Sequence, residues 1–117
     1  MFLNKRKLGS DYENVAAEYL KKEGYVLLEK NFRSRSGEID LIAKHGEYLV
    51  FIEVKYRKNL RNGAPLEAVH PGKQFVIGQT ARYYLLLHPK YQHMPCRFDV
   101  IGILGKEITL IQNAFYI

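Results

Sequence analysis

The segment from Gly37 to Lys55 constrains the fold more than any other part of the chain. Two runs rich in apolar, β-branched and aromatic residues, 39–44 and 48–55, flank the turn signal His45-Gly46-Glu47. Such a pattern is typical of a β-hairpin. If Gly46-Glu47 is a two-residue type II′ loop, or if the loop has four residues, Asp40 lies opposite Glu53 across the hairpin. A three-residue loop without a bulge would break this register.

The predicted register divides the hairpin into a charged face and an apolar face. Asp40 and Glu53 would have Cβ atoms about 4.5–5.5 Å apart, and the strand period of two adds Lys55 to their face. The opposite face is uniformly apolar and comprises Leu41, Ala43, Val50, Ile52 and Val54.

Two carboxylates in this arrangement repel each other. At roughly 4 Å the repulsion is about 4 kcal/mol in an effective dielectric near 20. A shared proton, a cation such as Lys55, or a divalent metal ion such as Mg²⁺ can offset it. The residues alone leave two interpretations open, a metal site and a structural Asp–Lys–Glu cluster.

Further helices and strands are predicted on both sides of the hairpin. Ser10 is a plausible helix N-cap, and Glu13 stands at capping-box spacing from it. Residues 1–9 are predicted as a flexible basic arm, and 56–69 as an irregular basic loop. The predicted elements are a helix at 10–23, a strand at 25–32, the hairpin, a helix at 71–87, and strands at 97–104 and 107–112.

Length and charge favour one basic domain, residues 1–117. Lys and Arg outnumber Asp and Glu by 18 to 12, which gives a net charge of +6 and favours a polyanionic partner, either nucleic acid or an anionic membrane surface. The single Cys96 excludes an internal disulfide and fits a reducing compartment; we expect it to be a small buried side chain. No signal-peptide pattern or membrane span is evident, so we expect a cytoplasmic protein that does not bind a membrane.

Asp40 followed by Glu53-Val54-Lys55 resembles the signature of PD-(D/E)XK nucleases, with Ile39 at the position of the proline. An ordered series of further segments resembles the YraN family, which is related to archaeal Holliday-junction resolvases. These segments cover nearly the whole chain: 13–20, 37–43, 50–55, 65–69, 73–74, 96–100 and 113–115.

The resemblance implies a restriction-endonuclease-like αβββαβ core, an α/β fold with a mixed central sheet flanked by helices. It also implies metal-dependent hydrolysis of phosphodiester bonds, in DNA ahead of RNA. Asp40, Glu53 and the Val54 carbonyl would hold Mg²⁺ or Mn²⁺, Lys55 would assist catalysis, and Glu13 would complete the acidic cluster. Glu13 follows Tyr12 where the family usually has glycine, and helix capping remains its alternative role. Related resolvases act as dimers, which leaves a homodimer open.

Basic and polar residues near these acids are candidates for nucleic-acid contact. They are Arg33, Arg35, Arg57, Lys58, Lys73 and Gln74. Lys73 lies at the N-terminal end of the second helix, on the face expected to point towards the sheet. Two rival interpretations are a non-catalytic nucleic-acid-binding module on the same fold and an interaction protein whose acid–lysine cluster is structural. Asp99 is predicted to be structural and to pair with Arg97 or with another basic residue.

Overall fold

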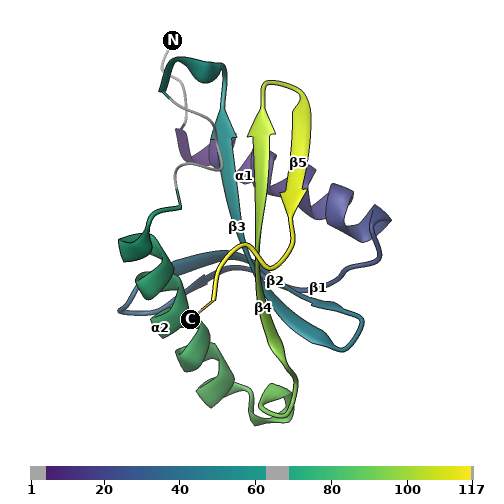
Figure 1. Ribbon diagram of the computed structural model, residues 1–117, viewed down its shortest axis with the longest axis vertical. Coiled ribbons are helices and arrows are strands. Elements are labelled where there is room, and N and C mark those ends of the chain that lie inside the picture. The colour runs from purple at the N-terminus through teal and green to yellow at the C-terminus, as the bar shows by residue number, and fades with distance from the viewer. Residues whose placement is uncertain (1–4, 63–68, 117) are drawn as a thin grey trace.

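The computed structural model describes residues 5–62 and 69–116, in which a five-stranded sheet lies between two helices (Figure 1). The predicted αβββαβ order is confirmed, and one further strand follows it. The elements are α1 Lys5–Lys22, β1 Val26–Arg33, β2 Glu38–His45, β3 Tyr48–Arg57, η1 Leu60–Asn62, α2 Pro71–Leu87, η3 Pro89–Tyr91, β4 Cys96–Leu104 and β5 Glu107–Ile111.

The sheet is mixed, with the strands in the order β1-β2-β3-β4-β5. The first three strands form an antiparallel meander, β3 and β4 run parallel, and β5 returns antiparallel along β4. The parallel pair requires a long crossover, which contains α2. In the β2–β3 hairpin His45 pairs with Tyr48 and Lys44 with Leu49, which confirms the predicted register. Gly46 has a φ of 59°, as the first turn residue of a type II′ loop requires.

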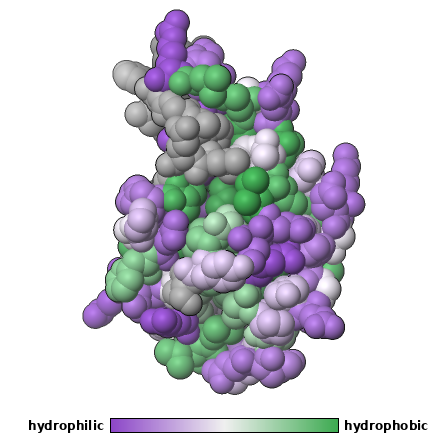
Figure 2. Space-filling view, viewed as in Figure 1, coloured by the Kyte–Doolittle hydropathy of each residue, from purple (hydrophilic) through white to green (hydrophobic). Residues whose placement is uncertain are grey.

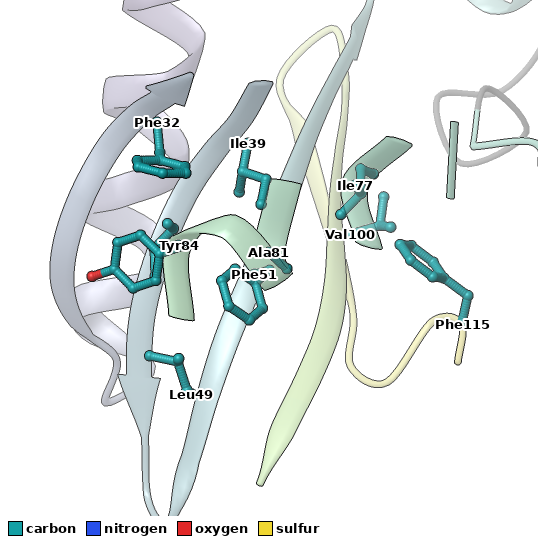
Figure 3. Packing of buried hydrophobic residues seen from close by; sticks show 10 residues of the cluster. Phe32, Ile39, Leu49, Phe51, Ile77, Ala81, Tyr84, Val100 and Phe115 are labelled. Atoms are coloured by element: carbon teal, nitrogen blue, oxygen red, sulfur yellow. The ribbon is translucent and has the colours of Figure 1, made fainter. Parts of the chain in front are cut away.

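Each face of the sheet carries its own hydrophobic core. The predicted apolar face of the hairpin packs under α1, where Ala16, Ala17 and Leu20 contact Leu41, Ala43, Val50 and Ile52. Val54, the fifth member of that face, packs against the same cluster. On the other face α2 contributes Ile77, Ala81 and Tyr84 to a cluster with Phe32, Phe51 and Phe115 (Figure 3). By the strand period of two, Asp40, Glu53 and Lys55 share the α2 face of the sheet, beyond the apolar residues that fill its core.

A close backbone approach fixes where α2 lies. A Cβ at Gly37, just before β2, would collide with the side chain of Val76 on α2, so glycine permits this contact. The helix begins at Pro71, and the backbone N–H of Lys73 donates to Nδ1 of the capping residue His70 at 3.3 Å. The predicted bounds of α2 are confirmed, and His88 follows it as the C-cap.

The start of α1 and the end of β3 differ most from the predicted boundaries. Helix α1 begins at Lys5, so Ser10 lies inside the helix and its predicted capping role is wrong. Residues 5–9 are helical, whereas residues 1–4 of the predicted arm lie outside the described residues. Strand β3 continues through Tyr56 and Arg57, which were predicted to be in the loop, because both residues pair with β4. Part of that loop, residues 63–68, also lies outside the described residues.

The C-terminal segment 112–116 follows β5 and crosses β4 (Figure 1). Strand β5 pairs with β4 only from Val100 to Leu104. Beyond this ladder the backbone N–H of Ala114 donates to the carbonyl of Phe98 at 2.7 Å. Hydrophilic side chains project around much of the outline in this view, with hydrophobic patches between them (Figure 2). Within the described residues, no helix has the length and hydrophobicity needed to cross a membrane.

Candidate metal and phosphate site

Asp40 lies where β2 separates from β3. The paired residues of the hairpin end at Leu41 and Ile52, one step before Asp40 and Glu53 would face each other. Instead, the Asp40 carboxylate accepts the backbone N–H of Val54 through Oδ2 at 2.7 Å. In a regular ladder the Val54 N–H would donate to a backbone carbonyl of the neighbouring strand, and here the Asp40 side chain takes that place. The second carboxylate oxygen of Asp40, Oδ1, is left for another partner.

The Asp40 carboxyl group is strongly perturbed. Burial raises its pKa from 3.8 to about 8, and the charge of Glu53 contributes further. The hydrogen bond from Val54 opposes this increase, whereas Glu13 and Glu38 add smaller repulsive contributions. A nearby cation would stabilise the ionised form, as expected at a metal site.

Glu53 lies between two lysines. Its Oε1 is 3.3 Å from Lys55 Nζ and 3.6 Å from Lys73 Nζ, while its side chain is only 6% exposed. The other oxygen, Oε2, is buried and has no hydrogen-bond partner among the described residues. Buried carboxylate oxygens are rarely left unsatisfied, so this atom indicates a missing partner.

Three carboxylates form a group with the spacing of metal ligands. One oxygen each of Glu13, Glu38 and Asp40 lies within 4.8 Å of the others. Glu13 comes from α1, whereas Glu38 and Asp40 come from the start of β2. Burial raises the pKa of Glu13, and a hydrogen bond from Asn31 partly opposes the increase. Asn31 has a φ of 54°, a left-handed conformation that asparagine tolerates better than most residues.

This group differs in composition from the predicted ligand set. Glu53 does not belong to it, although its charge affects Asp40 and Glu13. Glu38 does belong. Its spacing of two residues from Asp40 puts both side chains on one face of the strand, where the sequence alone allows either an extra acid of the site or a solvated strand end.

The basic candidates differ in their distance from these acids. Lys55 and Lys73 contact Glu53, and Arg33 lies 3.4 Å from Glu38. Arg35 and Lys58 are exposed. Arg57 donates to the carbonyl of Tyr56, and its Nε is buried without a partner among the described residues. Gln74 is not brought to the acids; its amide donates to the Val69 carbonyl at 3.2 Å and lines a small cavity near Phe115.

Two tyrosines adjoin the site residues. Tyr12 precedes Glu13 and Tyr56 follows Lys55, and their rings stack with centroids 3.6 Å apart. The contact joins α1 to the end of β3. Tyr12, which stands where the resembling family usually has glycine, therefore packs against the ring of Tyr56.

Comparison with known proteins identifies the family. The profile described as "Uncharacterised protein family UPF0102" matches residues 12–103. A UPF0102 protein of Lachnoclostridium phytofermentans is 50% identical over 113 residues, which cover 97% of this chain and 96% of the relative. A UPF0102 protein of Caldicellulosiruptor saccharolyticus is 42% identical over 119 residues, covering 97% of this chain and all of the relative (100%). The chain therefore belongs to the UPF0102 family, also called YraN.

Proposed function

We propose that the protein is a metal-dependent nuclease that hydrolyses phosphodiester bonds, with DNA as the expected substrate ahead of RNA. The observation that carries the proposal is the group formed by Glu13, Glu38 and Asp40, next to a buried Glu53 whose Oε2 lacks a partner. The resemblance to PD-(D/E)XK nucleases agrees with this assignment.

The residues present fit a hard divalent cation. Their ligands are carboxylate oxygens, which Mg²⁺ and Mn²⁺ prefer. Burial, followed by the charge of Glu53, raises the pKa of Asp40, and a bound cation would offset both effects. Glu13, Glu38 and Asp40 would hold the ion, with Glu53 and the Val54 carbonyl as further candidates. Such an ion supplies charge stabilisation at the phosphoryl group and lowers the pKa of bound water.

The lysines have roles that follow from where they lie. Lys55 is 20% exposed and is held by Glu53, so its ammonium is positioned by a buried partner while remaining accessible. It would stabilise negative charge that develops on the phosphoryl oxygens. Lys73, in the first turn of α2, would add a positive charge at the end of the helix that favours anions.

The surrounding cations would bind the nucleic-acid backbone without reading sequence. Arg33, Arg35 and Lys58 are exposed, and Arg33 and Arg35 lie close in the sequence to Glu38. Binding by phosphate contacts of this type weakens steeply with salt.

The decisive experiment measures cleavage of duplex, nicked and branched DNA and of RNA, with Mg²⁺, with Mn²⁺ and with EDTA. Asp40→Asn keeps an acceptor for the Val54 N–H and should abolish cleavage while retaining most affinity. Asp11→Asn, which changes an exposed acid on the same helix as Glu13, is the matched control and should cleave normally. Binding without cleavage of any substrate would instead favour the non-catalytic module. Absence of both would favour a structural acid–lysine cluster.

A further inference from the structure

A cavity of about 560 Å³ opens beside the first half of β4, away from the acidic group. Its walls include the aromatic side chains of Tyr48, Phe98, Phe115 and Tyr116. Tyr48 begins β3 and Glu53 stands five residues further along it, which corresponds to about 17 Å of strand. The volume lies within the range of small-ligand sites.

Arg97 lines this cavity and is held rigidly. Its Nε and Nη2 donate to the two oxygens of Asp99 at 2.9 and 2.8 Å. Nη2 also lies 3.0 Å from the Tyr25 hydroxyl and 2.9 Å from His45 Nδ1. Nη1 makes no hydrogen bond to any described residue. Because Nε and Nη2 are engaged, Nη1 is the part of the guanidinium whose N–H groups remain to donate to a ligand.

The charge distribution in the cavity does not favour binding of a small anion. Asp99 is fully buried and forms a two-point ion pair with Arg97, so the two charges largely cancel. The guanidinium lies over the ring of Tyr48, with Cζ 5.1 Å from the centroid. A ligand could therefore form directional hydrogen bonds with the polar side chains and stack on the aromatic rings, but would gain little from net charge.

Gln112 supplies an acceptor to complement the Arg97 donors. Its Nε2 donates to the Tyr25 hydroxyl at 3.1 Å, which leaves its amide oxygen for a ligand. The neighbouring Asn113 donates through its backbone N–H to Asp99 and through Nδ2 to Tyr116, which leaves its amide oxygen as a second acceptor. The cavity thus combines a fixed donor and an acceptor with aromatic walls.

We propose that this cavity binds a nucleobase, either of a free nucleoside or nucleotide or of an unpaired position in a strand. A base edge carries acceptors and donors together, as Arg97 and Gln112 require, and every base has a face that stacks on aromatic rings. A phosphate or an aliphatic acid would meet a guanidinium already neutralised by Asp99. The site is separate from the proposed metal site and does not depend on it.

Cys96 provides a site-specific reporter. It is the single cysteine of the chain, it is exposed, and it lines the cavity. The experiment measures its alkylation rate with a maleimide, in EDTA, while nucleosides, nucleotides or ribose 5-phosphate are titrated. Oligonucleotides, either fully paired or with one unpaired base, form the second arm. We expect saturable protection by nucleosides and nucleotides, by unpaired-base oligonucleotides, or by both, and none by ribose 5-phosphate.

Substitution of Tyr48, an aromatic residue of the cavity wall, tests whether the ligand binds in this cavity. Tyr48→Ala should raise the half-protecting concentration at least about five-fold. Tyr83→Ala, a similarly exposed tyrosine on α2 that does not line the cavity, should leave it unchanged. No protection by any base-containing probe at millimolar concentration would overturn the proposal, as would equal protection by ribose 5-phosphate or equal effects of the two variants. Because no cleavage or metal is measured, this result is independent of the nuclease assay.

Discussion

The ammonium group of Lys73 lies 3.6 Å from the Glu53 carboxylate, so the first turn of α2 is joined directly to the interior of β3. Glu53 is a buried acid in a sheet, and Lys55 on the same strand provides its second cation. The carboxylate is therefore held between residues from two elements, and the two lysines share the task of stabilising its charge.

Removal of both lysines should cost more than the sum of the single losses. Lys55→Met should lower the free energy of unfolding by about 1–2 kcal/mol, whereas the more exposed Lys73 should contribute less. The double variant leaves Glu53 without a cation among its described contacts, so we expect positive coupling between the two losses. Urea unfolding at pH 7 measures all three variants. Simple additivity would show that the two lysines act independently of each other and do not share the stabilisation of Glu53.

The Asp40 carboxyl group should make stability depend on pH and on divalent cations. Its folded-state pKa of about 8 lies above the ordinary 3.8, so the folded protein binds this proton more tightly than the unfolded chain. Stability therefore falls as pH rises between these values. Asp40→Asn removes the penalty, and its advantage over the wild type should grow from pH 5 to pH 9 to at least about 1 kcal/mol.

Mg²⁺ should replace the proton in the wild-type protein. At 100 times its Kd a bound ion stabilises the fold by about 2.7 kcal/mol, and this gain should disappear in Asp40→Asn and persist in Asp11→Asn. Thermal unfolding at pH 8 with and without the ion measures the effect. Equal stabilisation of all three proteins would place the ion elsewhere.

Gly37 and Gly46 should respond differently to alanine. A methyl group at Gly37 meets Val76, so Gly37→Ala forces α2 away from the start of β2 and should cost about 2–3 kcal/mol. At Gly46 the space is open, and only the left-handed backbone opposes the change, at about 1 kcal/mol. Chemical denaturation compares the two variants. A larger loss at Gly46 would contradict the packing argument.

Tyr25 should ionise only at high pH, and its hydroxyl group should contribute to the stability of the fold. Burial, with the hydrogen bond to Asp99, raises its pKa from 10 to about 12. The corresponding stability is complete below pH 10 and is lost as pH rises towards 12. Tyr25→Phe should cost about 1–3 kcal/mol at pH 7, because Asp99 and Arg97 lose a buried partner. Ultraviolet titration at 295 nm and urea unfolding check the two expectations.

Local sequence was sufficient to predict the hairpin register and the bounds of α2. Alternation places apolar side chains on one face, and a Gly-containing turn of fixed length sets the pairing. Pro71 and His88-Pro89 likewise bracket α2 by local backbone restrictions. For Asp99 the sequence predicted a basic partner, Arg97 or another residue, and the structure shows that the partner is Arg97.

Features that depend on contacts between distant segments were missed or wrong. Cys96 was expected to be buried but is exposed, at the start of β4 on the wall of the cavity. The stack of Tyr12 on Tyr56 joins α1 to β3, and no short-range pattern indicates it. The helical period adds Tyr83 and Leu87 to the hydrophobic face of α2 that carries Tyr84, but both side chains lie half exposed. The stripe that contacts the sheet is thus narrower than the hydrophobic pattern suggested.

The crossing of segment 112–116 over β4 has a consequence for how molecules of this protein meet one another. A strand edge left bare offers its backbone groups to any other chain and is a recognised route to aggregation. The bond from Ala114 to the Phe98 carbonyl occupies part of this edge where β5 no longer reaches. Segment 112–116 thus shields this part of the β4 edge from pairing with another chain, and its removal would favour edge-to-edge association.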